Sequence, residues 1–204
     1  MISTVIKDIP LSFETAPDLF SPNAVDAGTL AMLSCVDFSQ DDRILDLGCG
    51  YGAVGITAAK IIGEKNVIMC DVSETAVQYS KMNAALNQVS GIDIRLSNGF
   101  EAIPENNFSL ILSNPPYHTD FSVAKHFIET GFKRLTVGGR MVMVTKRLTW
   151  YKNKLTSVFG GVKVLSVNDY YVFIAEKRIP AAKQSSRNAN RLSKKLRRKY
   201  GKPV

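Results

Sequence analysis

The sequence predicts a single α/β domain over residues 1–178, with a mostly parallel β-sheet, helices on both faces and an antiparallel strand at one edge. Short apolar runs typical of buried strands alternate with segments of helical periodicity. A strand, a glycine loop and a helix follow one another between Arg43 and Ile62. Two final apolar runs flank Asn168-Asp169, as in a β-hairpin, which closes the sheet with an antiparallel strand.

Residues 1–40 form an N-terminal leader that we expect to cover one side of a ligand pocket. Residues 1–22 alternate weakly and contain Pro10, Pro17 and Pro22, which predicts short strands or a hairpin followed by a loop. Ser21-Pro22-Asn23 has the composition of a helix start, so a helix is predicted from there to Cys35. Phe20 is interpreted as a packing residue in preference to a ligand contact.

The rest of the domain alternates between strands and helices. Apolar runs bounded by turn residues predict strands at 44–47, 67–70, 92–96, 108–113, 141–144, 162–167 and 170–175. Helical periodicity predicts helices over 53–62, from Ser73 as N-cap to about Gln88, over 122–135 and over 148–159. Gly138-Gly139 is predicted to be a turn that precedes the strand at 141.

Charge is distributed unevenly along the chain. The net charge is +8, yet 11 of the 26 Lys and Arg residues lie after residue 176, where there is no Asp or Glu. The preceding residues carry 15 basic against 18 acidic groups, so the domain is slightly acidic and a C-terminal tail, residues 179–204, is basic. Leu192, Leu196 and Tyr200 lie four apart in this tail, which predicts either a basic helix against RNA or a solvated segment.

Composition also bounds the compartment and the chemistry. No apolar run of about 18 residues is present and the N-terminus has no signal layout, which predicts a cytoplasmic protein with no membrane partner. The cysteines, which are Cys35, Cys49 and Cys70, lack C-x-x-C spacing, and only His118 and His126 accompany them. Neither a disulfide framework nor a metal site is therefore predicted.

The glycine loop carries a binding motif. Gly50-x-Gly52-x-x-Gly55 matches the dinucleotide fingerprint, and Asp71 follows about 20 residues later, where an acid binds ribose hydroxyls. Asp46 at the mouth of the loop would repel a pyrophosphate but suits a cationic ligand. These residues leave three interpretations open: a sulfonium cofactor, a nicotinamide cofactor, or a glycine turn without a ligand.

A second motif, Asn114-Pro115-Pro116-Tyr117-His118, follows the strand predicted at 108–113. Two prolines after an asparagine hold the backbone extended and remove two N–H donors, which leaves carbonyl oxygens facing outward. A proline turn that only ends a strand requires neither the asparagine before it nor the aromatic residue after it.

Together the motifs resemble class I S-adenosylmethionine-dependent methyltransferases. Asp46-x-Gly48-x-Gly50-x-Gly52 resembles their first motif, and Asn114-Pro115-Pro116-Tyr117 resembles the signature of members that methylate an amino or amide nitrogen. The resemblance implies a Rossmann-like fold with a seven-stranded sheet and S-adenosylmethionine as the cofactor. It implies cofactor contacts at Asp46, Gly48, Cys49, Gly50, Gly52, Asp71, Val72, Asn98, Gly99, Phe100 and Asn114. Asn98 would receive the adenine amine, although an ordinary Asn-Gly turn explains it as well.

Residues 15–178 resemble the catalytic half of the small-subunit (16S) rRNA guanine-N2 methyltransferases. Phe20-Ser21, Asp26-x-Gly28-Thr29 and the Asn114 motif carry this resemblance. It implies methylation of a guanine amine in ribosomal RNA or a small-subunit particle. The implied catalytic residues are Asn114, Pro115, Pro116 and Tyr117, and the implied substrate-binding residues are Tyr117, His118, Lys146 and Arg147. Longer members carry a degenerate N-terminal half that this sequence lacks, and Thr145-Lys146-Arg147 departs from a more neutral stretch usual there.

Three alternatives share these motifs. The enzyme could methylate adenine N6 in RNA or DNA, or a glutamine N5 in a protein such as a release factor. A different class is an RNA-binding module on an inactive methyltransferase fold. The oligomeric state is left open as a monomer or a weak dimer.

Overall fold

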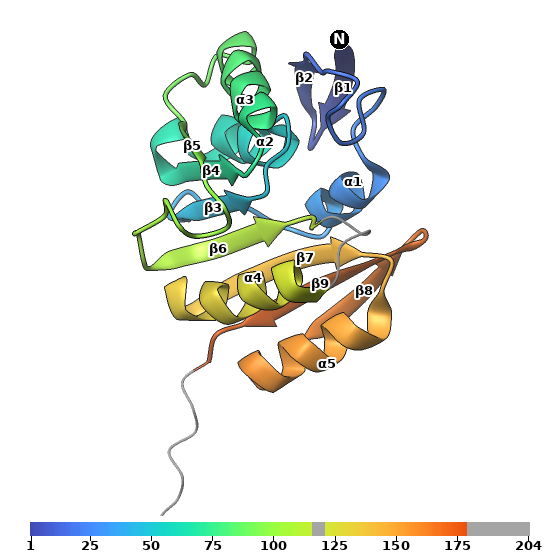
Figure 1. Cartoon of the computed structure of the whole chain (residues 1–204), viewed down its shortest axis with the longest axis vertical. Coiled ribbons are helices and arrows are strands. Elements are labelled where there is room, and N and C mark those ends of the chain that lie inside the picture. The colour runs from blue at the N-terminus through green and yellow to red at the C-terminus, as the bar shows by residue number, and fades with distance from the viewer. Residues whose placement is uncertain (116–120, 179–204) are drawn as a thin grey trace, which may run out of the picture.

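A computed structural model describes residues 1–115 and 121–178, and in this part of the chain seven strands form one sheet (Figure 1). The strands are β3 (Ile44–Leu47), β4 (Val67–Asp71), β5 (Asp93–Leu96), β6 (Phe108–Ser113), β7 (Leu135–Thr145), β8 (Lys163–Val167) and β9 (Tyr170–Glu176), in the order β5-β4-β3-β6-β7-β9-β8. Pairing is parallel from β5 to β7, and β9 is antiparallel to both β7 and β8. The predicted α/β sheet with an antiparallel edge is confirmed.

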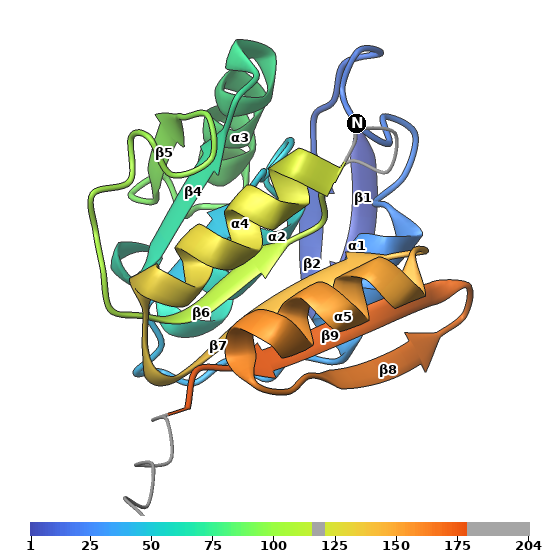
Figure 2. The same ribbon diagram turned by 60° about the horizontal axis from the view of Figure 1, so that its bottom comes forward.

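Helices cover both faces of the sheet. On one face lie α1 (Ala27–Ser34), α2 (Ala53–Ile62) and α3 (Glu74–Leu86), whose buried side chains form one core with the inward residues of β3 and β4. On the other face lie α4 (Phe121–Arg134) and α5 (Leu148–Phe159), which share a second core with β6, β7 and β9 (Figure 2). A 3-10 turn, Glu64–Asn66, joins α2 to β4. The sheet thus separates two hydrophobic cores.

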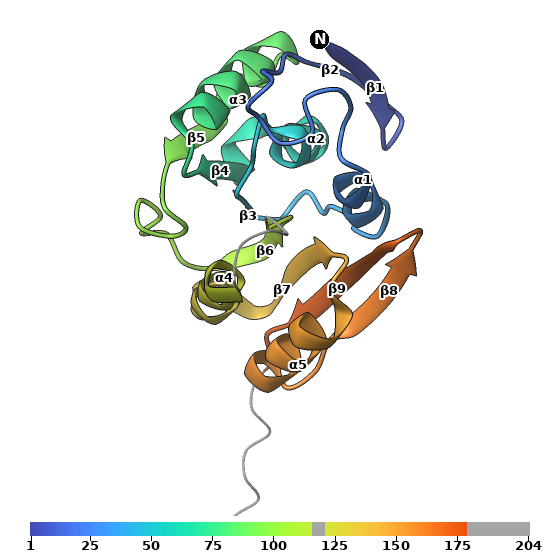
Figure 3. The ribbon, with the colours of Figure 1, turned by 45° about the vertical axis from the view of Figure 1, so that its right-hand side comes forward.

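The leader forms the predicted hairpin, β1 (Ile2–Ile6) and β2 (Ile9–Phe13), which lies beside α2 and α3 (Figure 3). Two buried asparagines, Asn83 in α3 and Asn87 at its C-cap, form hydrogen bonds with the backbone of the leader. Asn83 exchanges hydrogen bonds with Glu14 N and O at 2.7 and 2.9 Å, and Asn87 does so with Ser12 N and O at 3.1 and 2.7 Å. The side-chain amides replace strand pairing, and so the leader is fixed to the domain.

The predicted start of the first helix at Ser21-Pro22-Asn23 is wrong. The helix begins at Ala27, because the Asp26 carboxylate accepts the Thr29 N–H at 2.8 Å and so caps the helix. Ser21 has φ +55°, which is outside the helical region. A better capping group five residues later therefore decides the boundary.

The predicted turn at Gly138-Gly139 is also wrong, because both residues lie inside the continuous strand β7. Gly138 N donates to Lys177 O at 2.7 Å, and Lys177 N donates to Gly139 O at 2.8 Å. These bonds extend the pairing with β9, while Gly138, at φ +82°, lets the strand shift its register against β6. The glycines make an irregularity within a strand and not an end.

Candidate active site

A pocket of about 380 Å³ lies at the carboxyl ends of β3, β4 and β6. The strand order reverses between β3 and β6, so these ends flank the crevice where open α/β sheets bind ligands. Ten of the residues assigned to the site from the sequence line the pocket: Asp46, Gly48, Cys49, Gly50, Asp71, Val72, Asn98, Gly99, Asn114 and Pro115. Gly52, Phe100, Lys146 and Arg147 do not line it, and Pro116, Tyr117 and His118 lie outside the described residues.

The glycine loop between β3 and α2 is shaped to bring backbone to the pocket. Gly52 precedes α2 with φ +102°, a conformation that residues with a Cβ rarely adopt. Gly55, in the first turn of α2, packs so tightly that a Cβ would lie 2.5 Å from Met69 Cγ on β4. The glycines therefore serve both the loop conformation and the close packing of α2 on the sheet.

Two carboxylates define the electrostatics of the pocket. Asp46, at the end of β3, is 2% exposed, and its Oδ2 accepts the Gly55 N–H at 2.8 Å. Asp71, at the end of β4, accepts Gly50 N–H on Oδ2 at 2.8 Å and Ser73 N–H on Oδ1 at 3.0 Å. Burial, with a smaller contribution from Asp71, raises the pKa of Asp46 to about 7, against the opposing hydrogen bond from Gly55. A ligand cation next to Asp46 would offset the cost of burying its charged carboxylate. The two carboxylates therefore suit a positively charged ligand.

The pocket thiols are held in their neutral form. Burial, followed by the negative charges of Asp46 and Asp71, raises the pKa of the Cys49 thiol far above its usual value. Burial likewise raises the pKa of Cys70 to about 12. Thiolate chemistry at neutral pH is therefore disfavoured at both residues. No group of three or more His, Cys, Asp or Glu in the described ranges could hold a metal ion.

Side chains of α3 fix the loop from behind, and sequence reasoning missed them. Ser80 Oγ donates to Gly50 O at 2.7 Å, and Asn83 Nδ2 donates to Tyr51 O at 2.9 Å. Both residues have no measurable exposure. Asn83 also holds the leader, so a single buried side chain links the hairpin to the loop. Polar residues on the inward face of a predicted helix were the available signal.

The wall opposite the glycine loop is the turn after β5. Ser97 Oγ donates to Gly99 O at 2.9 Å and accepts Ala102 N–H at 2.9 Å, and the exposed Asn98 donates from Nδ2 to Glu101 at 3.0 Å. The other amide atom of Asn98, Oδ1, bonds to none of the described residues. The turn itself is stabilised locally, as in an ordinary Asn-Gly turn.

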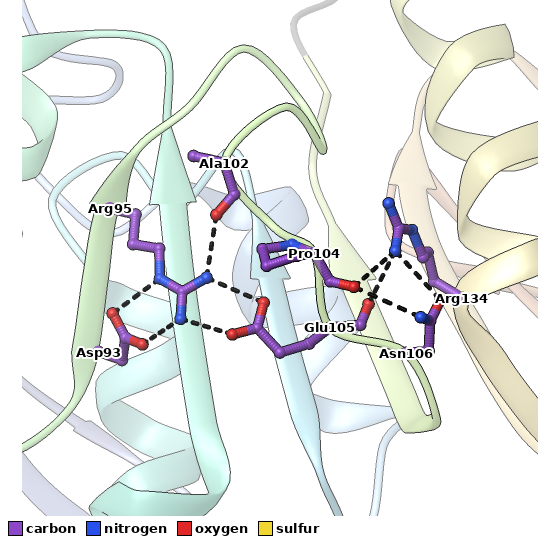
Figure 4. A network of polar contacts seen from close by, with 7 residues as sticks. All are labelled: Asp93, Arg95, Ala102, Pro104, Glu105, Asn106 and Arg134. Atoms are coloured by element: carbon purple, nitrogen blue, oxygen red, sulfur yellow. Dashed lines mark hydrogen bonds and ion pairs between the residues drawn. The ribbon is translucent and has the colours of Figure 1, made fainter.

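Two arginines hold the segment that continues from this turn to β6 (Figure 4). Arg95 on β5 pairs with Asp93 and Glu105 and donates to Ala102 O at 2.9 Å. Arg134, at the end of α4, donates to Pro104 O at 2.8 Å and to Asn106 Oδ1 at 3.1 Å. The Arg95 guanidinium lowers the pKa of Glu105 below its usual value. The segment that follows the pocket wall at 97–99 is thus fixed to both β5 and α4.

Asn114 and Pro115 follow β6 and form the corner of the pocket that faces the leader. Asn114 Nδ2 donates to Asp26 Oδ2 at 2.8 Å and to Thr29 Oγ1 at 3.0 Å. A carboxylate can only accept, so the nitrogen of the amide must face Asp26 and the oxygen Oδ1 lies on the opposite side. We call Asp26, Thr29, Asn114 and Pro115 the acceptor corner.

The leader contributes more to the site than its sequence indicated. Asp26, Thr29 and Phe20 all line the pocket, and none was assigned to it individually from the sequence. Phe20 is 51% exposed and lines the pocket, which favours the ligand contact over the packing role. The Asp26-x-Gly28-Thr29 pattern was the signal that pointed to this segment. That residues 1–40 as a whole cover one side of the pocket stays a prediction.

Basic residues lie after β7, next to the acceptor corner. Lys146 and Arg147 are exposed; Lys146 Nζ lies 4.8 Å from the centre of the Tyr170 ring, and Arg147 Cζ lies 5.1 Å from that of Phe121. A Cβ on Gly28 would lie 2.7 Å from the same Tyr170 ring, which places Lys146 close to the start of α1. Lys152 is exposed, whereas Lys154 forms an ion pair with Glu129.

These features define a Rossmann-like domain whose pocket joins a buried carboxylate, suited to a cationic nucleoside, with an oriented amide acceptor. The chain belongs to the methyltransferase small domain family, whose sequence profile matches residues 10–175. Family membership removes the nicotinamide interpretation of the glycine loop.

Relatives and solved structures agree with this assignment. The chain is 32% identical over 160 residues to ribosomal RNA small subunit methyltransferase C of Cronobacter sakazakii, covering 76% of this chain and 46% of the relative. It matches the Thermus thermophilus 16S rRNA N2 G1207 methyltransferase, solved with AdoMet and guanosine, with TM-score 0.80 and 28% identity, covering 86% of this chain and 50% of that one. A Pyrococcus furiosus methyltransferase, at 23% identity and TM-score 0.68, covers 83% of this chain and 90% of its own and shares the fold.

The chain spans about half the length of the curated relatives it matches. No helix in residues 1–115 and 121–178 has the length and apolar character needed to cross a bilayer.

Proposed function

We propose that the protein is an S-adenosylmethionine-dependent methyltransferase that modifies the exocyclic N2 amine of guanine in small-subunit ribosomal RNA. The observation that carries the proposal is the acceptor corner: the Asn114 amide is held with its oxygen away from Asp26, in the same pocket as Asp46 and Asp71. The similar Thermus thermophilus enzyme, solved with AdoMet and guanosine, supports both the cofactor and the base.

The glycine-loop side of the pocket fits the cofactor. Asp46 is buried with a raised pKa, and Asp71 stands about 20 residues after the loop at the end of the next strand, as an acid that binds ribose hydroxyls does. When bound, S-adenosylmethionine supplies an electrophilic methyl group on a sulfonium sulfur, which leaves as a neutral thioether. Asp46 and Asp71 would attract its positive charge, and Asn98 Oδ1 would accept a hydrogen bond from its adenine amine.

The acceptor corner would activate the guanine amine. This nitrogen is a poor nucleophile because its lone pair is delocalised into the ring. Asn114 Oδ1 and the Pro115 carbonyl oxygen would accept its two hydrogens, which favours a pyramidal nitrogen whose lone pair attacks the methyl carbon. The hydrogen bonds strengthen as positive charge develops on nitrogen, so they favour the transition state over the ground state. The alkylated nitrogen then loses one proton to water or to His118.

Base stacking and phosphate contacts would complete the substrate site. Tyr117 is expected to stack on the base, a contact worth about 1–3 kcal/mol. A guanine within structured RNA must first be unstacked, which requires a grip on the flanking phosphates. Lys146, Arg147 and Lys152 are exposed after β7 and could supply that grip, whereas Lys154 is engaged by Glu129. The basic tail, residues 179–204, remains a second candidate and lies outside the described residues.

The proposed partners and location follow from the substrate. The enzyme would act on ribosomal RNA or on a small-subunit particle, in the cytoplasm. The prediction of a monomer or a weak dimer would be tested by sedimentation of the purified chain at micromolar concentration.

Methyl transfer to identified acceptors tests the proposal. The purified chain would be incubated with labelled S-adenosylmethionine and with total RNA and total protein from cells lacking it, and both fractions digested and analysed by mass spectrometry. We expect labelled N2-methylguanosine from the small-subunit RNA. Asn114→Ala serves as the negative control in the same assay.

Other products would identify the competing functions. Labelled N6-methyladenosine would replace the guanine assignment with adenine methylation, and labelled glutamine would replace it with protein methylation. Calorimetric binding of S-adenosylmethionine without transfer to any acceptor would favour an inactive RNA-binding module. Any of these three results would overturn the proposal.

A further inference from the structure

We infer that Asp26 is a positioning residue: with Thr29, it holds the Asn114 amide in the orientation that presents Oδ1 to the substrate amine. The inference rests on the proposed function, because it explains how the chain sets the acceptor on which that function depends. Asp26 belongs to the leader and lies 88 residues from Asn114 in the sequence.

The need for such a residue follows from the chemistry of the amide. Its nitrogen and oxygen ends have nearly the same shape, so steric packing alone barely distinguishes the two orientations. Only the orientation with Oδ1 toward the pocket offers a hydrogen-bond acceptor to the substrate amine. In the reverse orientation the amide N–H groups would face the N–H groups of the amine. A group that fixes an acceptor oxygen beside the nitrogen end resolves this ambiguity.

Asp26 has that property and is itself fixed. Its Oδ2 accepts Asn114 Nδ2–H at 2.8 Å and Thr29 N–H at 2.8 Å, so the helix cap holds the carboxylate in place. Thr29 Oγ1, of a residue only 7% exposed, is the second acceptor at 3.0 Å. The two acceptors engage both hydrogens of the Asn114 amide nitrogen.

The backbone around Asp26 makes room for this arrangement. A Cβ on Gly28 would lie 2.9 Å from Asp26 Oδ2 and 2.7 Å from Tyr170 Cε1 on β9. Gly28 therefore lets the start of α1 approach β9 while the carboxylate keeps its direction toward Asn114. The Asp26-x-Gly28-Thr29 pattern is explained by one requirement, an oriented acceptor next to β6.

Three variants separate orientation from charge and from capping. Asp26→Asn keeps an oxygen that can accept from both Thr29 N–H and Asn114 Nδ2 but removes the charge. Thr29→Val keeps the shape and the helix cap but removes one acceptor. Asp26→Ala removes the orienting acceptor together with the cap, and the loss of the cap alone costs about 1 kcal/mol of stability.

Steady-state kinetics with small-subunit RNA, together with cofactor binding by calorimetry, test the inference. For Asp26→Ala we expect kcat to fall about 10- to 100-fold with cofactor affinity within about twofold of wild type, since the loss occurs at the reacting amine. Asp26→Asn should restore kcat to within about threefold of wild type, and Thr29→Val should lie between them. Urea unfolding of each variant establishes that the domain remains folded at the assay temperature.

A second readout does not depend on turnover. The side-chain NH₂ signals of Asn114, identified by their loss in Asn114→Ala, should show slowed exchange with solvent in wild type and Asp26→Asn and fast exchange in Asp26→Ala. Wild-type kcat in Asp26→Ala, or an Asp26→Asn protein as impaired as Asp26→Ala, would overturn the positioning role. A wild-type chain that transfers no methyl group but shows the slow-exchange signals would overturn the proposed function alone.

Discussion

The two sides of the pocket are built in different ways. The side that would hold the methyl donor, called the donor side, consists of β3, the glycine loop, α2 and β4 and comes from one continuous segment, residues 44–71. Its carboxylates accept backbone N–H groups of that segment or of the turn that follows it. The acceptor corner joins Asn114 to Asp26 and Thr29, which are 88 and 85 residues away. The pocket residues of the donor side are consecutive in the chain, although Ser80 and Asn83 of α3 hold its loop. The acceptor corner, in contrast, exists only when the domain is folded around the leader.

This difference implies a division of labour. The donor side holds buried charge and shaped backbone, which are suited to binding. The acceptor corner holds an oriented amide, which is suited to an interaction made only during reaction. Changes on the donor side should therefore alter cofactor affinity and stability, and changes in the corner should alter turnover.

The largest effect is expected for Asn114→Ala. Loss of one preorganised transition-state contact typically lowers kcat about 10²- to 10³-fold. Cofactor affinity should stay within a few-fold of wild type, because Asp46, Asp71 and the glycine loop are untouched. Single-turnover methylation and calorimetric titration measure the two quantities. If Asn114→Ala loses cofactor affinity and turnover to the same extent, Asn114 belongs to the donor side, and the proposed separation of binding from turnover is wrong.

Gly55→Ala tests the donor side through packing. The added Cβ would lie 2.5 Å from Met69 Cγ and 3.1 Å from Asp46 Oδ2, so either α2 moves or Met69 and Asp46 do. Overpacking of this kind costs about 1–3 kcal/mol, and a displaced Asp46 should weaken cofactor binding roughly tenfold. Thermal unfolding and calorimetry measure the two effects. Gly161→Ala is the matched control, since nothing lies within 4 Å of its Cβ position; an equal effect in both variants would argue against the packing explanation.

The same contrast explains what could be predicted from the sequence. The donor side was predictable because its residues, from Asp46 to Asp71, are read in order along one strand–loop–helix–strand unit. Asn114 was assigned to the site from the two prolines that follow it. Asp26, Thr29, Ser80 and Asn83 were not assigned, because their roles depend on contacts between elements distant in sequence. The start of α1 was misplaced for a related reason: a proline signal at Pro22 competed with a stronger cap at Asp26.

The raised pKa of Asp46 predicts a pH dependence that belongs to the donor side alone. Because the pKa in the folded domain, about 7, exceeds the ordinary value of 3.8, the folded state favours the protonated form, and this stabilisation is lost as pH rises through about 7. The free energy of unfolding should fall by about 1.4 kcal/mol between pH 6 and pH 8 on this account. Asp46→Asn should remove that part of the slope while weakening cofactor binding. Urea unfolding at three pH values gives the free energy of unfolding of wild type and Asp46→Asn. If it falls equally with pH in both proteins, Asp46 is not the group responsible.

The smallest effect concerns the basic residues beside the acceptor corner. If Lys146 contacts one RNA phosphate, Lys146→Gln should reduce the slope of log affinity against log salt by about 0.7 to 0.9 and leave cofactor affinity unchanged. Lys154→Gln is the matched control, because Lys154 already pairs with Glu129 and has less charge to offer a phosphate. Filter binding over a salt series distinguishes the two. Equal slopes for Lys146→Gln and wild type would remove Lys146 from the phosphate grip and leave that role to Arg147, Lys152 or the basic tail.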